Sequence, residues 1–125
     1  MKKKFLRLND ISSYKTAFNL ANYVWGIVVK WDYFARDTMG KQFVRSIDSI
    51  SANIAEGFGR YGKRDKIKFY RIALGSIKES LDWNEKAKVR NLLKKDEHQY
   101  ILEKLGKLNK DVYSLIKFTN IKLTI

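Results

Sequence analysis

The sequence contains no cysteine, no proline and a single histidine among its 125 residues. Without cysteine the chain has no disulfide, no zinc–thiolate site and no thiol nucleophile, and this composition fits a reducing compartment, so we expect a cytoplasmic protein. The absence of proline favours long, uninterrupted helices. The longest apolar run, residues 23–29, is far shorter than the roughly 20 residues of a membrane-spanning helix, so we expect no membrane association.

Acidic residues are also few: 13 Asp and Glu stand against 26 Lys and Arg, which gives a formal net charge of +13. Lys2, Lys3 and Lys4 resemble the start of a signal peptide, but Asn9 and Asp10 interrupt what would be its apolar region, so that interpretation is rejected. A large positive excess indicates attraction to a polyanion, most often a nucleic acid. The alternative is a lysine-rich helical surface that only keeps the protein soluble, and we favour the nucleic acid.

Side chains suited to catalysis or metal binding are scarce. His98 is not part of a Glu-x-x-His pair, which a di-iron site in a helical bundle requires, and one histidine without cysteine does not make a usual zinc site. No Gly-x-Ser-x-Gly motif occurs, and the glycines of residues 57–62 lack the Lys-Ser/Thr of a phosphate-binding loop. We therefore expect no enzymatic activity, no cofactor and no metal.

Apolar residues at helical spacing predict helices over residues 13–33, 41–56, 63–90 and 96–119. Ser12 or Ser13 is expected to cap the first helix, residues 35–40 are expected to form a link, and Gly57 is expected to end the second helix. Asn91 is expected to end the third helix. Four helices with short connections predict an all-α, antiparallel up-down four-helix bundle that forms a single domain over residues 1–125.

The second helix organises the rest of the chain. Phe43, Ile47, Ile50 and Ile54 lie on one helical stripe, and small residues beside this stripe allow another helix to approach closely. The third helix carries two seams: Ile67, Tyr70, Leu74, Ile77, Leu81 and Asn84 form the first, and Phe69, Ala73, Ser76, Ser80, Trp83 and Ala87 form the second. Two seams predict contacts on both sides of the helix, and the second seam is a candidate contact with another subunit.

Two further features concern the second and third helices. Gly75, next to Ser76 and close to Ala73, predicts a close helix crossing. Asn53, Glu56, Ser76 and Glu79 are predicted to form a polar cluster between the two helices. We favour a structural hydrogen-bond network for this cluster, because buried polar networks fix helix register. A catalytic or ion-binding site in the pore of an oligomer is the alternative.

The strongest candidate for a functional surface is the loop before the third helix together with the first turns of that helix. Its candidate nucleic-acid-binding residues are Arg60, Tyr61, Lys63, Arg64, Lys66, Lys68 and Arg71. The cations contact phosphates without reading base sequence, and the tyrosine ring offers a stacking surface for a base. A second basic cluster lies at the other end of the same helix, at Lys86, Lys88, Arg90, Lys94 and Lys95.

Two motifs carry a family resemblance. Residues 49–57 read Ser-Ile-Ser-Ala-Asn-Ile-Ala-Glu-Gly, followed by Gly59 and Arg60, and residues 72–79 read Ile-Ala-Leu-Gly-Ser-Ile-Lys-Glu. Together they resemble the four-helix-bundle proteins encoded by 23S rRNA intervening sequences, over about residues 14–119, although Ser51 stands where that family usually has proline. Asn53, Glu56, Gly57, Gly75, Ser76 and Glu79 are the residues of the two structural motifs.

The resemblance implies a homopentamer and a fold similar to that of the accessory protein of diversity-generating retroelements, and it implies no reaction. Our leading hypothesis is a non-enzymatic, homo-oligomeric protein that binds nucleic acid, RNA or DNA, with structured RNA preferred. The alternative is a protein-interaction scaffold, such as an accessory factor of a reverse transcriptase or a ribonucleoprotein.

Overall fold

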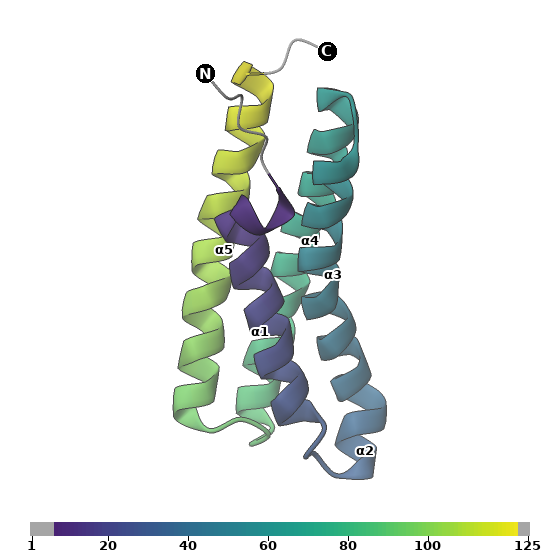
Figure 1. The fold of residues 1–125 in the computed structure, drawn as a ribbon. Helices are drawn as coiled ribbons and strands as arrows, with labels where there is room; N and C mark the ends of the chain where they lie inside the picture. The colour runs from purple at the N-terminus through teal and green to yellow at the C-terminus, as the bar shows by residue number, and fades with distance from the viewer. Residues whose placement is uncertain (1–6, 123–125) are drawn as a thin grey trace.

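Four long helices run alternately in opposite directions along the molecule (Figure 1). They are α1 (Ser12–Val28), α3 (Lys41–Gly59), α4 (Lys63–Val89) and α5 (Lys95–Lys122). The computed structural model describes residues 7–122, so the lysines at positions 2–4 and residues 123–125 lie outside the described residues. A short helix, η1 (Leu8–Asp10), precedes α1, and residues 7–122 contain no strand. The predicted all-helical, four-helix bundle is confirmed.

Each long helix packs on two neighbours: α3 and α5 both contact α1 and both contact α4. The stripe predicted on the second helix faces the centre, where Phe43, Ile47, Ile50 and Ile54 are at most 1% exposed. The facing helices contribute Leu20, Ile77 and Leu105, which are buried to the same degree. Removing this apolar surface from water stabilises the bundle, because each fully buried side chain of this size contributes roughly 1.5–3 kcal/mol.

The first connection differs from the prediction. Helix α1 ends at Val28 instead of Tyr33, and the predicted link over residues 35–40 is helical. Asp32 caps a new helix, because its Oδ1 accepts a hydrogen bond from the backbone N–H of Ala35 at 3.0 Å. The short helix α2 (Tyr33–Ala35) continues through one turn of π-helix, η2 (Arg36–Gly40), directly into α3. The predicted cap of α1 is also wrong. Ile11 occupies the N-cap position, and neither Ser12 nor Ser13 caps the helix.

The predicted end of the second helix at Gly57 is wrong, because α3 continues to Gly59. Gly57 is buried, and a Cβ atom on it would lie 2.6 Å from Cε1 of Tyr70 and 3.0 Å from the carbonyl oxygen of Lys66. Glycine is therefore needed at this position for close packing of α3 against α4, and not for a turn. The chain then turns through residues 60–62, and Gly62 occupies the N-cap position of α4.

Both seams of the third helix are used within one bundle. Ser76 and Ser80 of the second seam donate hydrogen bonds to Ser49 and Ser46 of α3, so the middle of this seam faces α3. Gly75 does not lie at a close crossing, because it is exposed and a Cβ atom on it would meet no atom within 4 Å. The prediction for Gly75 is therefore wrong within the bundle.

The last connection follows the prediction closely. Helix α4 ends at Val89, and Asn91 adopts a positive φ of 60° that turns the chain away from the helix axis. Asp96 and Glu97 lie in the first turn of α5, where negative charge interacts favourably with the helix dipole. Glu97 also accepts a hydrogen bond from the backbone N–H of Lys94 at 2.8 Å. Trp31 is buried against this connection, and its indole N–H donates to the carbonyl oxygen of Leu92 at 3.0 Å.

Candidate nucleic-acid interface

The predicted basic residues lie at the end of the bundle where α3 turns into α4, the end at which α5 also finishes (Figure 1). Arg64, Lys68 and Arg71 are exposed at spacings of four and three residues, so they share one face of α4. Arg64 and Arg71 make no hydrogen bond or ion pair with any residue in the described part of the chain. We call these three residues the α4 basic face.

The other predicted cations make contacts within the protein. Arg60 lies 3.2 Å from a carboxylate oxygen of Glu56, and its guanidinium lies 4.6 Å from the centroid of the Phe69 ring. The ammonium group of Lys63 lies 3.4 Å from the carbonyl oxygen of Asn120 at the end of α5. Tyr61, which lies between them in sequence, is 81% exposed and keeps its ring free for stacking.

Lys66 was predicted to contact nucleic acid, but its ammonium group is directed at the end of α3. It donates hydrogen bonds to the carbonyl oxygens of Phe58 at 2.7 Å and Gly57 at 3.4 Å. These carbonyls lie at the C-terminus of a helix, where a positive charge is favourable. Partial burial lowers the pKa of the Lys66 ammonium group. Lys66 therefore stabilises the connection between α3 and α4 and is removed from the candidate interface.

A first prediction separates Lys66 from Lys68, which lies two residues further along the same helix. Lys66→Gln is expected to reduce the free energy of unfolding by about 1 kcal/mol, because the α3 carbonyls lose a charged hydrogen-bond donor, and to leave RNA affinity unchanged. Lys68→Gln is expected to weaken RNA binding and to leave the free energy of unfolding unchanged, since Lys68 is exposed. Urea unfolding and filter binding of both variants measure the two effects. A loss of RNA affinity in Lys66→Gln alone would contradict the assignment.

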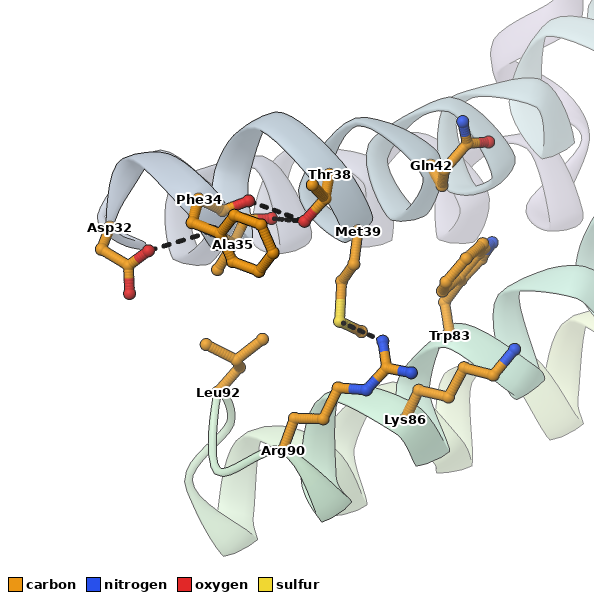
Figure 2. Close-up of a pocket in the computed structure, with 10 residues that line it drawn as sticks. All are labelled: Asp32, Phe34, Ala35, Thr38, Met39, Gln42, Trp83, Lys86, Arg90 and Leu92. Carbon is orange, nitrogen blue, oxygen red and sulfur yellow. Dashed lines mark hydrogen bonds between the residues drawn. The ribbon is translucent and has the colours of Figure 1, made fainter.

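A groove opens at the opposite end of the bundle, between the segment α2–η2 and the C-terminal part of α4 (Figure 2). Its volume is about 770 Å³. Figure 2 shows Phe34 and Trp83 on opposite sides of the groove, with Met39 between them and Arg90 below. Sequence reasoning missed this site because it took residues 35–40 for a link. The pattern of Asp32 before an apolar pair was the one signal for the additional helix start.

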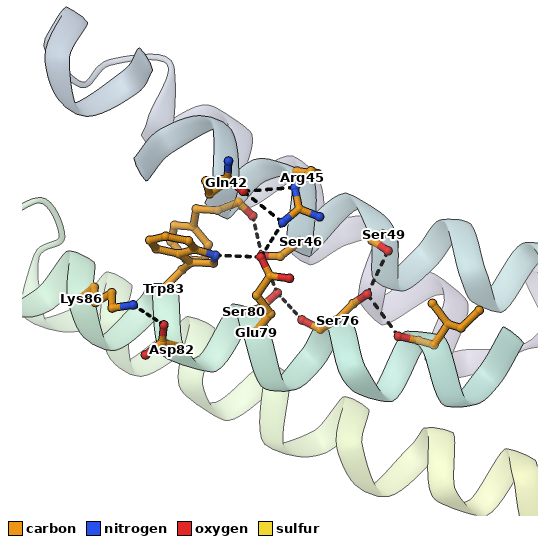
Figure 3. Close-up of polar contacts among 12 residues, drawn as sticks. Gln42, Arg45, Ser46, Ser49, Ser76, Glu79, Ser80, Asp82, Trp83 and Lys86 are labelled. Atoms are coloured by element: carbon orange, nitrogen blue, oxygen red, sulfur yellow. Dashed lines mark hydrogen bonds and ion pairs between the residues drawn. The ribbon is translucent and has the colours of Figure 1, made fainter. Parts of the chain in front are cut away.

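Polar side chains join α3 to α4 along the second seam (Figure 3). The hydroxyl of Ser80 donates to that of Ser46 at 3.0 Å, and the hydroxyl of Ser76 donates to that of Ser49 at 2.9 Å. Hydroxyl groups this small satisfy one another while the two helix backbones remain close. The amide of Asn53 extends the network, donating to the carbonyl and hydroxyl oxygens of Ser49 at 2.8 and 2.9 Å.

The predicted cluster of Asn53, Glu56, Ser76 and Glu79 therefore does not form as one unit. Asn53 and Ser76 meet only through Ser49, whereas Glu56 is turned toward Arg60. Glu79 lies 2.6 Å from Arg45 and accepts a hydrogen bond from the indole N–H of Trp83 at 3.0 Å (Figure 3). These contacts support the structural interpretation of the cluster. No group of three or more acidic or histidine side chains arranged to hold a metal occurs among residues 7–122.

His98 has a structural contact. Its side chain is buried, and its Nε2 lies 2.8 Å from Oε1 of Glu85 on α4, while its backbone carbonyl accepts a hydrogen bond from Asn84 at 3.2 Å. The single histidine of the chain thus joins α4 to the first turn of α5.

Among residues 7–122, no helix combines the length and the apolar character that crossing a bilayer requires.

The fold and the exposed cations define a basic, antiparallel four-helix-bundle protein. A model of the 23S rRNA-intervening sequence protein family matches residues 9–114, and the chain belongs to this family. A protein of unknown function from the S23 ribosomal protein family of Bacteroides thetaiotaomicron VPI-5482 has a similar crystal structure, with a TM-score of 0.75 and 24% sequence identity over 84% of this chain and 98% of that one. This likeness supports the fold. No curated protein matches the chain.

Proposed function

We propose that this protein is a non-enzymatic, homo-oligomeric RNA-binding protein whose α4 basic face contacts the phosphate backbone of structured RNA. The observation that carries the proposal is that Arg64, Lys68 and Arg71 are exposed on one helix face and that none of them forms an ion pair with a described residue. The formal net charge of +13 supplies long-range attraction to the same ligand. The exposed ring of Tyr61 is available to an unpaired base.

The test is RNA affinity as a function of salt, because each phosphate contact releases counterions. We expect wild-type affinity to fall steeply with salt and the triple variant Arg64→Gln, Lys68→Gln and Arg71→Gln to bind at least about tenfold more weakly at low salt, with a log–log slope flatter by about 2. The matched control is Lys30→Gln, Lys95→Gln and Lys110→Gln, which removes the same charge from exposed sites elsewhere. Filter binding to a structured RNA measures both quantities.

Equal slopes for the wild type and the triple variant would reject this surface as the RNA interface and favour the alternative, a scaffold that binds a protein partner. Equal losses in the triple variant and its control would mean that net charge matters and the position of the charge does not. Either result contradicts the proposal, because it assigns the contacts to one face of α4.

The oligomeric part of the proposal is supported by apolar side chains on the outer face of α1. Phe18, Trp25 and Val29 lie seven and four residues apart, so they share one face, and they are 50%, 56% and 43% exposed. Trp25 and Val29 also border an apolar depression together with Val44 of α3. Contiguous exposed apolar surface of this kind marks interaction sites. The family resemblance supplies the number of subunits, five.

We expect light scattering at micromolar concentration to show an oligomer for the wild type. Trp25→Glu is expected to dissociate it, because a carboxylate in an apolar interface loses its hydration, while circular dichroism of the helices remains unchanged. Tyr113→Glu on α5 is the control, since Tyr113 is 51% exposed and lies off this face. A monomeric wild type would reject the assembly.

A further inference from the structure

The groove at the α2 end of the bundle combines two exposed or partly exposed aromatic rings with a cation that has no acidic partner. Arg90 makes no ion pair among the described residues, and the contact of its guanidinium is a hydrogen bond to the Met39 sulfur at 3.5 Å (Figure 2). A thioether is a weak acceptor, so most of the five guanidinium N–H donors remain available. We propose that this groove binds a nucleotide, with the base stacked on Trp83 and the phosphate on Arg90.

Among the charged residues that line the groove, Arg90 is the one available to an anionic ligand. Lys86 also lines the groove, but its ammonium group lies 2.5 Å from a carboxylate oxygen of Asp82. Asp32 is the one acidic residue of the lining, and its Oδ1 accepts the hydrogen bond that caps α2. The planar guanidinium of Arg90 is suited to hold two phosphate oxygens at once.

Trp83 is held in a defined orientation before any ligand binds. Its indole N–H donates to Glu79, and Glu79 is in turn paired with Arg45 of α3 at 2.6 Å (Figure 3). The ammonium group of Lys86 lies 4.7 Å from the centroid of the Trp83 ring. A ring fixed in this way offers a stacking surface to a base at little further loss of conformational freedom.

The opposite wall of the groove is formed by irregular helix. Phe34, which is 76% exposed, lies on α2, and Thr38 and Met39 lie on the π-turn η2 that follows it. Single π-turns inside helices are frequently found at functional sites. Because a π-turn has one more residue than an α-turn, it changes the direction in which the following side chains leave the helix. The π-turn therefore gives the α2 wall a different side-chain register from that of α3.

The nucleotide has two sources with the same chemistry: a free mononucleotide, or an unpaired nucleotide of an RNA strand. The second source extends the proposed RNA-binding function to a second site. The groove and the α4 basic face lie at opposite ends of the bundle, so the two sites are tested separately.

The experiment follows the indole N–H signals of Trp25, Trp31 and Trp83 by NMR, each assigned with a single Trp→Phe variant. Adenosine 5′-monophosphate is expected to shift the Trp83 signal in a saturable way and to leave the other two in place, and adenosine is expected to bind about tenfold more weakly because it lacks the phosphate. Arg90→Gln is also expected to weaken binding of the mononucleotide by about tenfold. Lys88→Gln is the matched control, since Lys88 is exposed on the same helix and does not line the groove.

Hexa-adenylate distinguishes the two sources. A tighter Trp83 response to hexa-adenylate than to the mononucleotide supports an RNA strand, and an equal or weaker one supports a free nucleotide. The groove response is expected to persist in the triple variant of the α4 basic face, even if that variant shows the proposed function to be wrong. The proposal is overturned if neither ligand moves the Trp83 signal, if wild type and Arg90→Gln bind equally, or if the signal moves on dilution without ligand, which would place a second copy of the chain in the groove.

Discussion

Gly57→Ala is expected to destabilise the protein by about 1–3 kcal/mol, even though alanine is the better helix former. Gly57 lies inside α3, and an added Cβ would lie 2.6 Å from Cε1 of Tyr70 and 3.0 Å from the carbonyl oxygen of Lys66. Tyr70 is 2% exposed and Lys66 presents its backbone, so neither group moves away without disturbing the packing of α4 on α3. Urea unfolding of the variant beside the wild type measures the effect.

Gly75→Ala is the control, because it makes the same chemical change within a neighbouring helix. Gly75 is exposed and a Cβ there meets no atom within 4 Å, so the gain in helix propensity is expected to stabilise the protein by up to about 1 kcal/mol. The two substitutions should therefore change the free energy of unfolding in opposite directions. A Gly57→Ala protein as stable as Gly75→Ala would show that α3 and α4 are not packed as closely as the structure has them.

Phe43→Ala is expected to have the larger effect, a loss of about 3–5 kcal/mol. Phe43 is 0% exposed in the centre of the bundle, and the smaller side chain removes its apolar contacts and leaves a cavity. A loss of this size is a large part of the roughly 5–15 kcal/mol by which a typical domain is stable. We expect a strongly lowered Tm and unfolding midpoint, with the helical content retained at low temperature.

Phe118→Ala is the matched control, since Phe118 is 53% exposed on α5. It is expected to change the free energy of unfolding by no more than about 0.5 kcal/mol. Similar losses for both variants would mean that the stripe of α3 is rotated away from the core, and the register of the bundle would be wrong.

The helices and their buried stripes follow from local sequence pattern. Phe43, Ile47, Ile50 and Ile54 are spaced so that only a helix brings them to one side, and all four are in the core. The start of α5 also follows from local sequence, because the negative charges of Asp96 and Glu97 favour the first turn of a helix. The motifs of residues 49–57 and 72–79 led to the family, which the match over residues 9–114 confirms.

The candidate nucleic-acid interface was predictable only in part. Spacing alone places Arg64, Lys68 and Arg71 on one helix face, and they are exposed there. Spacing does not show which cations already make contacts within the protein, because their partners come from other helices. Lys66 reaches the end of α3, and Lys63 reaches the end of α5. The groove joins residues about 50 positions apart, such as Met39 and Arg90, so no local pattern indicates it.

The roles of the glycines depended entirely on how the helices pack. A glycine in a sequence is equally compatible with a helix end, a close crossing and an exposed turn of helix, because each of these tolerates a missing side chain. The sequence predicted a helix end at Gly57 and a close crossing at Gly75. In the structure Tyr70 packs against Gly57, and Gly75 faces open space. The distance to a neighbouring helix decides between these roles, and that distance exists only after α3 and α4 have come together.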